Sequence, residues 1–167
     1  MKITAFKPLL LTVLSALLPV TQSGAATVSI MIIETSGNPN AVSGTAGIWE
    51  GGMMDVFFEL GHIVSNAPAL NVLQADDEVL NSEARSGFEE ADRNGADYFV
   101  VARLDYPIGG EVKGTQKPER VSLKLYKIHP YGILYDKNFD ADFSTHETLS
   151  NAKKAAMILA TYLRGGS

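Results

Sequence analysis

Continuous apolar runs mark out buried strands in the first two thirds of the chain. Residues 27–35 are apolar on both faces over their central part, which is typical of a central parallel strand. Asn94-Gly95 is a helix-stop signal, and the run that follows it, residues 97–106, predicts a second buried strand parallel to the first. Residues 62–65 predict a short further strand.

The last third of the chain changes to alternation of apolar and polar residues, which predicts an antiparallel meander with one wet face. Residues 120–128 alternate first and are followed by a turn at residues 129–132. Residues 133–143 alternate next, and their predicted apolar face consists of Ile133, Tyr135, Phe139, Ala141 and Phe143.

Helical spacing of apolar residues predicts three helices. The first covers residues 45–60 and contains Gly51-Gly52, which favours close approach to the sheet or a kink. The second is expected over residues 82–93. In the third, Ser144 and Glu147 form a capping box, and the apolar stripe consists of Leu149, Ala152, Ala156, Leu159 and Leu163.

These elements predict a single α+β domain over residues 27–167, in the order β-α-β-α-β-β-β-α. The sheet is expected to be mixed, with about five strands, and the first and last helices are expected on one face. The chain of 167 residues is long enough for one domain with its own core.

Residues 1–26 have the layout of a secretory signal peptide rather than of a folded element. Lys2 and Lys7 precede an apolar run over residues 9–20, and small residues then allow cleavage after Ala25 or Ala26. An uncleaved anchor helix is the alternative, but the run is short for a bilayer. The chain contains no cysteine, which excludes a lipid-anchored cysteine and all disulfides.

The charge of the chain narrows the classes of partner. The formal net charge is −5, and loss of Lys2 and Lys7 with the signal peptide would leave −7. An acidic protein without a basic patch is a poor match for the phosphate backbone of nucleic acids. No second apolar run is long enough for a transmembrane helix, so an exported, periplasmic protein is expected.

The order of these elements resembles the amino-terminal domain of the translocation protein TolB. It also resembles the α/β domains of the curli-secretion lipoprotein CsgG and of the lipoprotein activators of penicillin-binding proteins. The matching parts are the first strand, the run Gly95-Ala96-Asp97 with the strand after it, the alternating pair and the last helix. The resemblance implies non-enzymatic work in a cell envelope through protein–protein contacts.

The chain also departs from these families. It is too short to carry the propeller of TolB, and it lacks the lipidated cysteine of CsgG and of the activators. The loop over residues 107–119 is too short and polar for membrane-spanning hairpins. No site residue of these families therefore maps onto this sequence.

The loop over residues 36–47 is the first candidate site, because the junction from a strand to a helix often binds anions. It has glycines but no complete phosphate-binding motif, so a plain connecting loop is the alternative. The candidate ligand-binding residues are Ser36, Asn38, Ser43, Gly44 and Thr45.

A row of polar residues on one face of the last strand is the second candidate. This acidic row consists of Asp136, Asn138, Asp140 and Asp142. It is suited to a basic partner or a divalent cation, although Ca²⁺ ligands usually come from a curved loop. A solvated face that protects a sheet edge is the alternative.

Catalytic and metal motifs are not apparent in the sequence. The three histidines are far apart and lack partners at metal-ligand spacing, so neither a metal nor another cofactor is expected. Glu34, Arg103 and Asp105 are expected to meet at the ends of the two central strands. Such carboxylates suit acid–base work, but nothing supplies a nucleophile or an oxyanion hole.

The sequence therefore predicts a non-enzymatic, exported envelope protein that acts as a periplasmic protein–protein interaction module. A small-ligand binder that uses the loop over residues 36–47 is the alternative. An enzyme acting on glycans through Glu34 and Asp105 has the least support. Trp49 is expected in the core, or in a partner interface if it is exposed.

Overall fold

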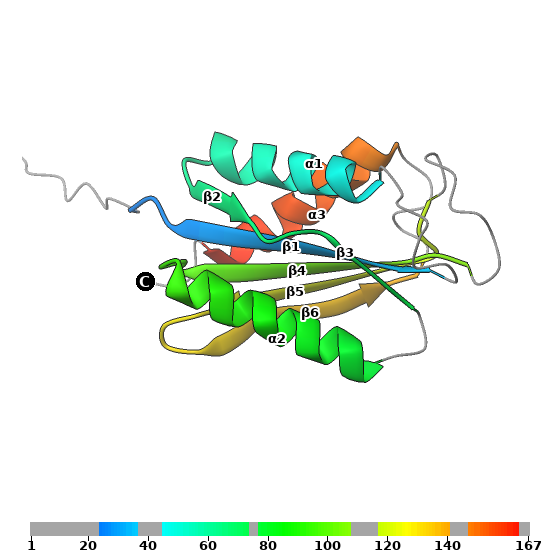
Figure 1. Cartoon of the computed structure of the whole chain (residues 1–167). Helices are drawn as coiled ribbons and strands as arrows, with labels where there is room; N and C mark the ends of the chain where they lie inside the picture. The colour runs from blue at the N-terminus through cyan, green and yellow to red at the C-terminus, as the bar shows by residue number, and fades with distance from the viewer. Residues whose placement is uncertain (1–23, 37–44, 74–76, 108–116, 141–146, 164–167) are drawn as a thin grey trace, which may run out of the picture.

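The computed structural model describes residues 24–36, 45–73, 77–107, 117–140 and 147–163, which contain one mixed sheet of six strands and three helices (Figure 1). This confirms the predicted α+β class. The elements in chain order are β1 (Thr27–Ser36), α1 (Thr45–Glu59), β2 (Ile63–Asn66), β3 (Leu70–Leu73), α2 (Asp77–Arg93), β4 (Tyr98–Asp105), β5 (Arg120–Lys127), β6 (Gly132–Phe139) and α3 (Thr148–Leu163).

The sheet is built around the parallel pair β1 and β4, as the two apolar runs predicted. Its order is β2-β1-β4-β5-β6, and the pairs β4–β5 and β5–β6 are antiparallel, which confirms the meander. β1 is long enough to pair with two short parallel strands in succession. Its first four residues pair with β2 and its last four residues pair with β3.

β3 and the start of α2 differ from the predictions. β3 makes the sheet six-stranded, and it begins in a segment for which no strand was predicted, because Pro68 interrupts the apolar pattern. α2 begins at Asp77 rather than at Ser82, since Leu80 already packs into the core. Among the described residues, no helix is long and apolar enough to cross a membrane.

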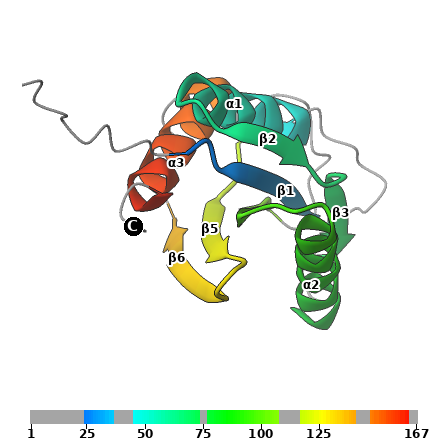
Figure 2. The same ribbon diagram turned by 90° about the vertical axis from the view of Figure 1, so that its left-hand side faces the viewer.

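One face of the sheet is covered by α1 and α3, which lie side by side on it (Figures 1 and 2). Trp49 and Phe57 of α1 are fully buried there, as is Leu159 of α3, so the prediction that Trp49 belongs to the core is confirmed. A Cβ atom at Gly52 would lie 2.8 Å from Cβ of Ala152. The close approach that the glycine pair predicted is therefore made to α3 rather than to the sheet.

Among the described residues, the other face is covered by α2, which lies over β1 and β4 and not over β5 and β6 (Figure 2). A Cβ atom at Gly87 would lie 2.7 Å from Sδ of Met31 and 3.0 Å from Cζ of Phe99. Gly87 thus lets the helix sit close on the two central strands. Gly95 ends α2 with a φ of 75°, as the helix-stop signal predicted.

The apolar face predicted for the last strand is correct only in part. Tyr135 is buried opposite Leu125, but a bulge follows between Leu125 and Tyr126. Because of this bulge, Ile133 pairs with Tyr126 and lies on the opposite face, where it is exposed. Leu149, predicted in the buried stripe of the last helix, is also largely exposed, while the other four residues of that stripe are buried.

Candidate functional site

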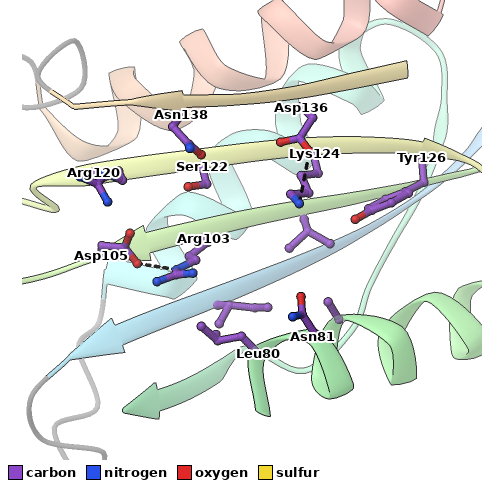
Figure 3. Close-up of a pocket in the computed structure, with 13 residues that line it drawn as sticks. Leu80, Asn81, Arg103, Asp105, Arg120, Ser122, Lys124, Tyr126, Asp136 and Asn138 are labelled. Atoms are coloured by element: carbon purple, nitrogen blue, oxygen red, sulfur yellow. Dashed lines mark hydrogen bonds and ion pairs between the residues drawn. The ribbon is translucent and has the colours of Figure 1, made fainter. Parts of the chain in front are cut away.

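The open part of the second face forms a groove of about 390 Å³ between α2 and the strands β4, β5 and β6 (Figure 3). Leu80, Asn81 and Ala84 line it from the helix. We call this hollow the α2 groove. Its floor and far wall come from strand residues that share one face, namely Arg103, Asp105, Arg120, Ser122, Lys124, Tyr126, Asp136 and Asn138.

Strand register explains why these residues lie together. Paired residues on neighbouring strands point to the same side of a sheet, and every second residue joins them. Arg103 pairs with Ser122, and Ser122 pairs with Asn138. Lys124 pairs in the same way with Asp136. The wet face that the alternation predicted is thus a continuous polar surface across three strands.

The inner end of the groove holds a buried carboxylate. Asp105 Oδ1 accepts hydrogen bonds from Thr35 Oγ1 at 2.5 Å and from Arg103 Nε at 2.6 Å. The side chain of Asp105 is 6% exposed, whereas that of Arg103 is 28% exposed. The ion pair is therefore a fixed part of the structure, and the guanidinium group also reaches the groove surface.

Two further ion pairs lie on the exposed side of the groove. Lys124 Nζ is 3.3 Å from Asp136 Oδ2, and Arg120 Nε is 2.7 Å from Asp140 Oδ1. The hydrogen bond to Asp140 raises the pKa of Arg120, so its charge is permanent. Exposed pairs of this kind are weak, because water and salt screen them. A charged group of a binding partner can therefore replace one member of such an ion pair at little cost in free energy.

Aromatic rings border the other end of the groove. Phe88 of α2 meets the rings of Tyr126 and Tyr131 edge-on, with centroids 5.9 and 5.6 Å away. Tyr131 is 66% exposed, and burial raises the pKa of Tyr126. His129 Nε2 lies 2.8 Å from Asp92 Oδ1, which ties the turn between β5 and β6 to α2. An amphipathic aromatic surface held in this way suits a partner's apolar side chain.

The charged side chains that line the groove form ion pairs with one another. Each of its three cations already faces a carboxylate. No group of three or more metal-ligating side chains occurs in the described residues. Arg103 and Asp105 meet as predicted, but Glu34 does not join them. Glu34 pairs with Leu104 and is buried on the α1 side of the sheet, which removes the carboxylate pair proposed for a glycan-cleaving enzyme.

The predicted loop site is only partly described by the structure. Ser36 is the last residue of β1, and Thr45 is a buried residue at the start of α1. Asn38, Ser43 and Gly44 lie outside the described residues. The small-ligand site therefore stays a prediction.

The structure describes three of the four residues of the acidic row, and these three lie at the α2 groove. Asp136 and Asn138 line the α2 groove, and Asp140 binds Arg120 at its end, whereas Asp142 lies outside the described residues. Sequence reasoning missed the facing cations and the aromatic border. Pairing the two alternating runs outward from Lys127 and Gly132 would have opposed Lys124 to Tyr135, because the observed pair of Lys124 with Asp136 depends on the bulge.

Comparisons with known proteins give a likeness in fold. The sequence matches no known protein family and no curated protein. Among solved structures, the PelC dodecamer from Paraburkholderia phytofirmans is 12% identical, with a TM-score of 0.43, over 83% of this chain and 87% of that one. The hypothetical protein CT253 from Chlamydia trachomatis is 10% identical, with a TM-score of 0.44, over 83% of this chain and 99% of that one.

TolB from Acinetobacter baumannii, which belongs to one of the families that the order of elements resembles, also matches in fold. It is 13% identical, with a TM-score of 0.39, over 84% of this chain. The chain spans only 28% of the length of TolB. At these identities the likeness concerns the fold alone.

Proposed function

We propose that this chain is a non-enzymatic, exported envelope protein that binds another envelope protein through the α2 groove. Residues 1–26 would direct it to the periplasm and be removed there. The domain that starts at residue 27 would then act as the interaction module.

The observation that carries this proposal is the polar face of β5 and β6, which no helix of the described residues covers. A protein of this size can bury a sheet face under a helix, as α1 and α3 do on the other side. Here the strands instead present exchangeable ion pairs, and the exposed ring of Tyr131 lies at the turn that joins them. Charged groups of this kind select a partner, and an aromatic anchor beside them adds contact area.

Photocrosslinking in the native cells tests the proposal. A photoreactive amino acid placed at Ser122 or Asn138 samples the groove, and the same group at Ser150 of α3 samples the opposite side of the domain. We expect one dominant envelope protein to be captured from both groove positions and not from Ser150. Mass spectrometry of the adduct identifies it.

Two other outcomes would count against the proposal. Equal capture from all three positions would show that the groove is not the binding surface. Turnover of an envelope substrate by the purified protein, lost on Asp105→Asn but not on Asp55→Asn, would show that the groove is catalytic.

A further inference from the structure

The α2 groove ends at an open edge of the sheet. Within the described residues the strand β6 pairs only with β5, so its other edge between Ile133 and Asn138 presents backbone N–H and C=O groups (Figure 2). Edge strands with such free groups can accept a strand from another protein. The chemistry on the two sides of this edge determines which strand would fit.

The groove side of the β6 edge is acidic. Asp136 and Asp140 lie four residues apart, with Asn138 between them. Their side chains are 46% and 77% exposed, although each already pairs with a cation of β5. A carboxylate has two oxygens and accepts more than one hydrogen bond. Each aspartate can therefore bind a second cation from the open side.

The α3 side of the same edge is apolar except for Lys137, whose Nζ lies 5.7 Å from the centroid of the Tyr135 ring. Tyr135 of β6 is buried, and the centroid of its ring lies 5.0 Å from that of Tyr162 of α3. Phe139 and Ile158 are partly buried against the same core. α3 lies above this edge in Figure 2, with Tyr162 41% exposed. A strand added here would find an apolar surface on this side.

The inner edge of β6 already binds a strand of the matching pattern. β5 reads R-V-S-L-K-L-Y-K, so its basic residues Arg120 and Lys124 face the aspartates while Val121, Leu123 and Leu125 face the core. The outer edge has the same acidic and apolar sides. A second strand of this pattern would therefore meet complementary chemistry on both faces.

We infer that the outer edge of β6 accepts an extended segment of the partner, in which Lys or Arg alternates with apolar residues. This inference rests on the proposed function and specifies its mode, namely strand addition. The basic side chains bind Asp136 and Asp140, and the apolar ones pack beside Tyr162. Charges on an edge normally prevent unselective pairing. Here they repel acidic strands and admit basic ones.

A blocked synthetic peptide with the β5 sequence, R-V-S-L-K-L-Y-K, is a direct probe. Binding to the purified domain is measured by calorimetry at low salt. The control peptide E-V-S-L-E-L-Y-E keeps the apolar pattern and reverses the charge. We expect the basic peptide to bind and the acidic one not to. Asp136→Asn with Asp140→Asn should weaken binding about tenfold, because two exposed ion pairs are lost.

The matched control variant is Glu59→Gln with Glu90→Gln, which removes the same charge from exposed helix positions. It should bind the basic peptide as the wild type does. Equal weakening in both double variants would mean that only the net charge matters, and the inference would be wrong.

Peptide N-methylation separates strand addition from simple charge attraction. One peptide is methylated at Val, Leu and Leu, and the other at Ser, Lys and Tyr, so each loses the donors of one edge. We expect one version to bind and the other to fail. Hydrogen exchange should also slow at β6 amides when the peptide binds. Equal binding of both versions, or protection elsewhere, would overturn strand addition.

A second copy of this chain is the competing occupant of the edge. If β6 amides are protected in the free protein and lose that protection on dilution, self-association covers the edge and the inference fails. The two proposals can also fail separately. Specific crosslinking from Ser122 and Asn138 without peptide binding keeps the interaction module and rejects strand addition, whereas failure of both rejects both.

Discussion

Under the proposed function, one face of this sheet stabilises the domain and the other face binds the partner. On the α1 and α3 side, large side chains such as Trp49 and Phe57 are completely buried. On the α2 side, the helix covers only β1 and β4, and the strands β5 and β6 carry paired charges instead. Removing a side chain should therefore cost stability on the first face and affect binding on the second.

The sharpest test of this contrast compares two phenylalanines. Phe57→Ala on the closed face should lower the free energy of unfolding by about 3–5 kcal/mol, since a fully buried ring leaves a cavity. Phe88→Ala at the groove should cost about 2 kcal/mol, because its ring is only partly buried and water can replace it. Urea unfolding followed by circular dichroism measures both, and equal losses would mean that the groove side is an ordinary core.

A second comparison concerns the carboxylates of the groove. Asp105→Ala should lower the free energy of unfolding by about 2 kcal/mol, because Arg103 and Thr35 lose a nearly buried charged acceptor. Asp136→Ala should change it by less than about 1 kcal/mol, since its ion pair is exposed. Thermal and urea unfolding of the two variants check this. A cost at Asp136 as large as that at Asp105 would contradict the view that the outer pairs are exchangeable.

The glycine pair in α1 tests how closely the two helices of the closed face pack. Gly52→Ala should destabilise by about 1 kcal/mol, because the new Cβ would lie 2.8 Å from Cβ of Ala152, and this clash exceeds the gain in helix propensity. Gly51→Ala should instead stabilise by about 1 kcal/mol, since nothing lies within 4 Å of its Cβ position. Melting temperatures that move in the same direction would show that α1 and α3 can separate.

The sequence predicted the fold class and four of the six strands with their pairing, because the periods of those strands are clear. The two apolar runs gave the parallel pair β1 and β4, and the alternation gave β5 and β6. β3 was not predicted, because the four residues of this strand, which follow Pro68, are too few to establish a period. The bulge at Leu134 was not predicted either, since a bulge changes side-chain direction without a reliable sequence signal.

For the site, the sequence could predict only which side chains share a face of one strand, and not which side chains of neighbouring strands meet. The acidic row and the pair of Arg103 with Asp105 followed from alternation within one strand. The cations that face the row depend on the register between β5 and β6, which no single strand contains. The same dependence explains the error at Glu34. A register that pairs Thr35 with Asp105 necessarily places Glu34 on the other face.

The smallest expected effect concerns Tyr126, whose ring lies on the α2 side beside Phe88 and Phe99. Burial raises its pKa above the usual value of 10.0, so the folded state keeps the phenol neutral where the unfolded state ionises it. Stability from this group is complete below pH 10.0 and is lost as the pH rises towards the higher folded pKa. Tyr126→Phe should remove that part of the alkaline loss, because phenylalanine has no group to ionise. Unfolding measured from neutral to alkaline pH checks this, with Tyr131→Phe as the matched exposed control. If Tyr131→Phe flattened the profile as much as Tyr126→Phe, the exposed border of the groove rather than its half-buried ring would control the alkaline response.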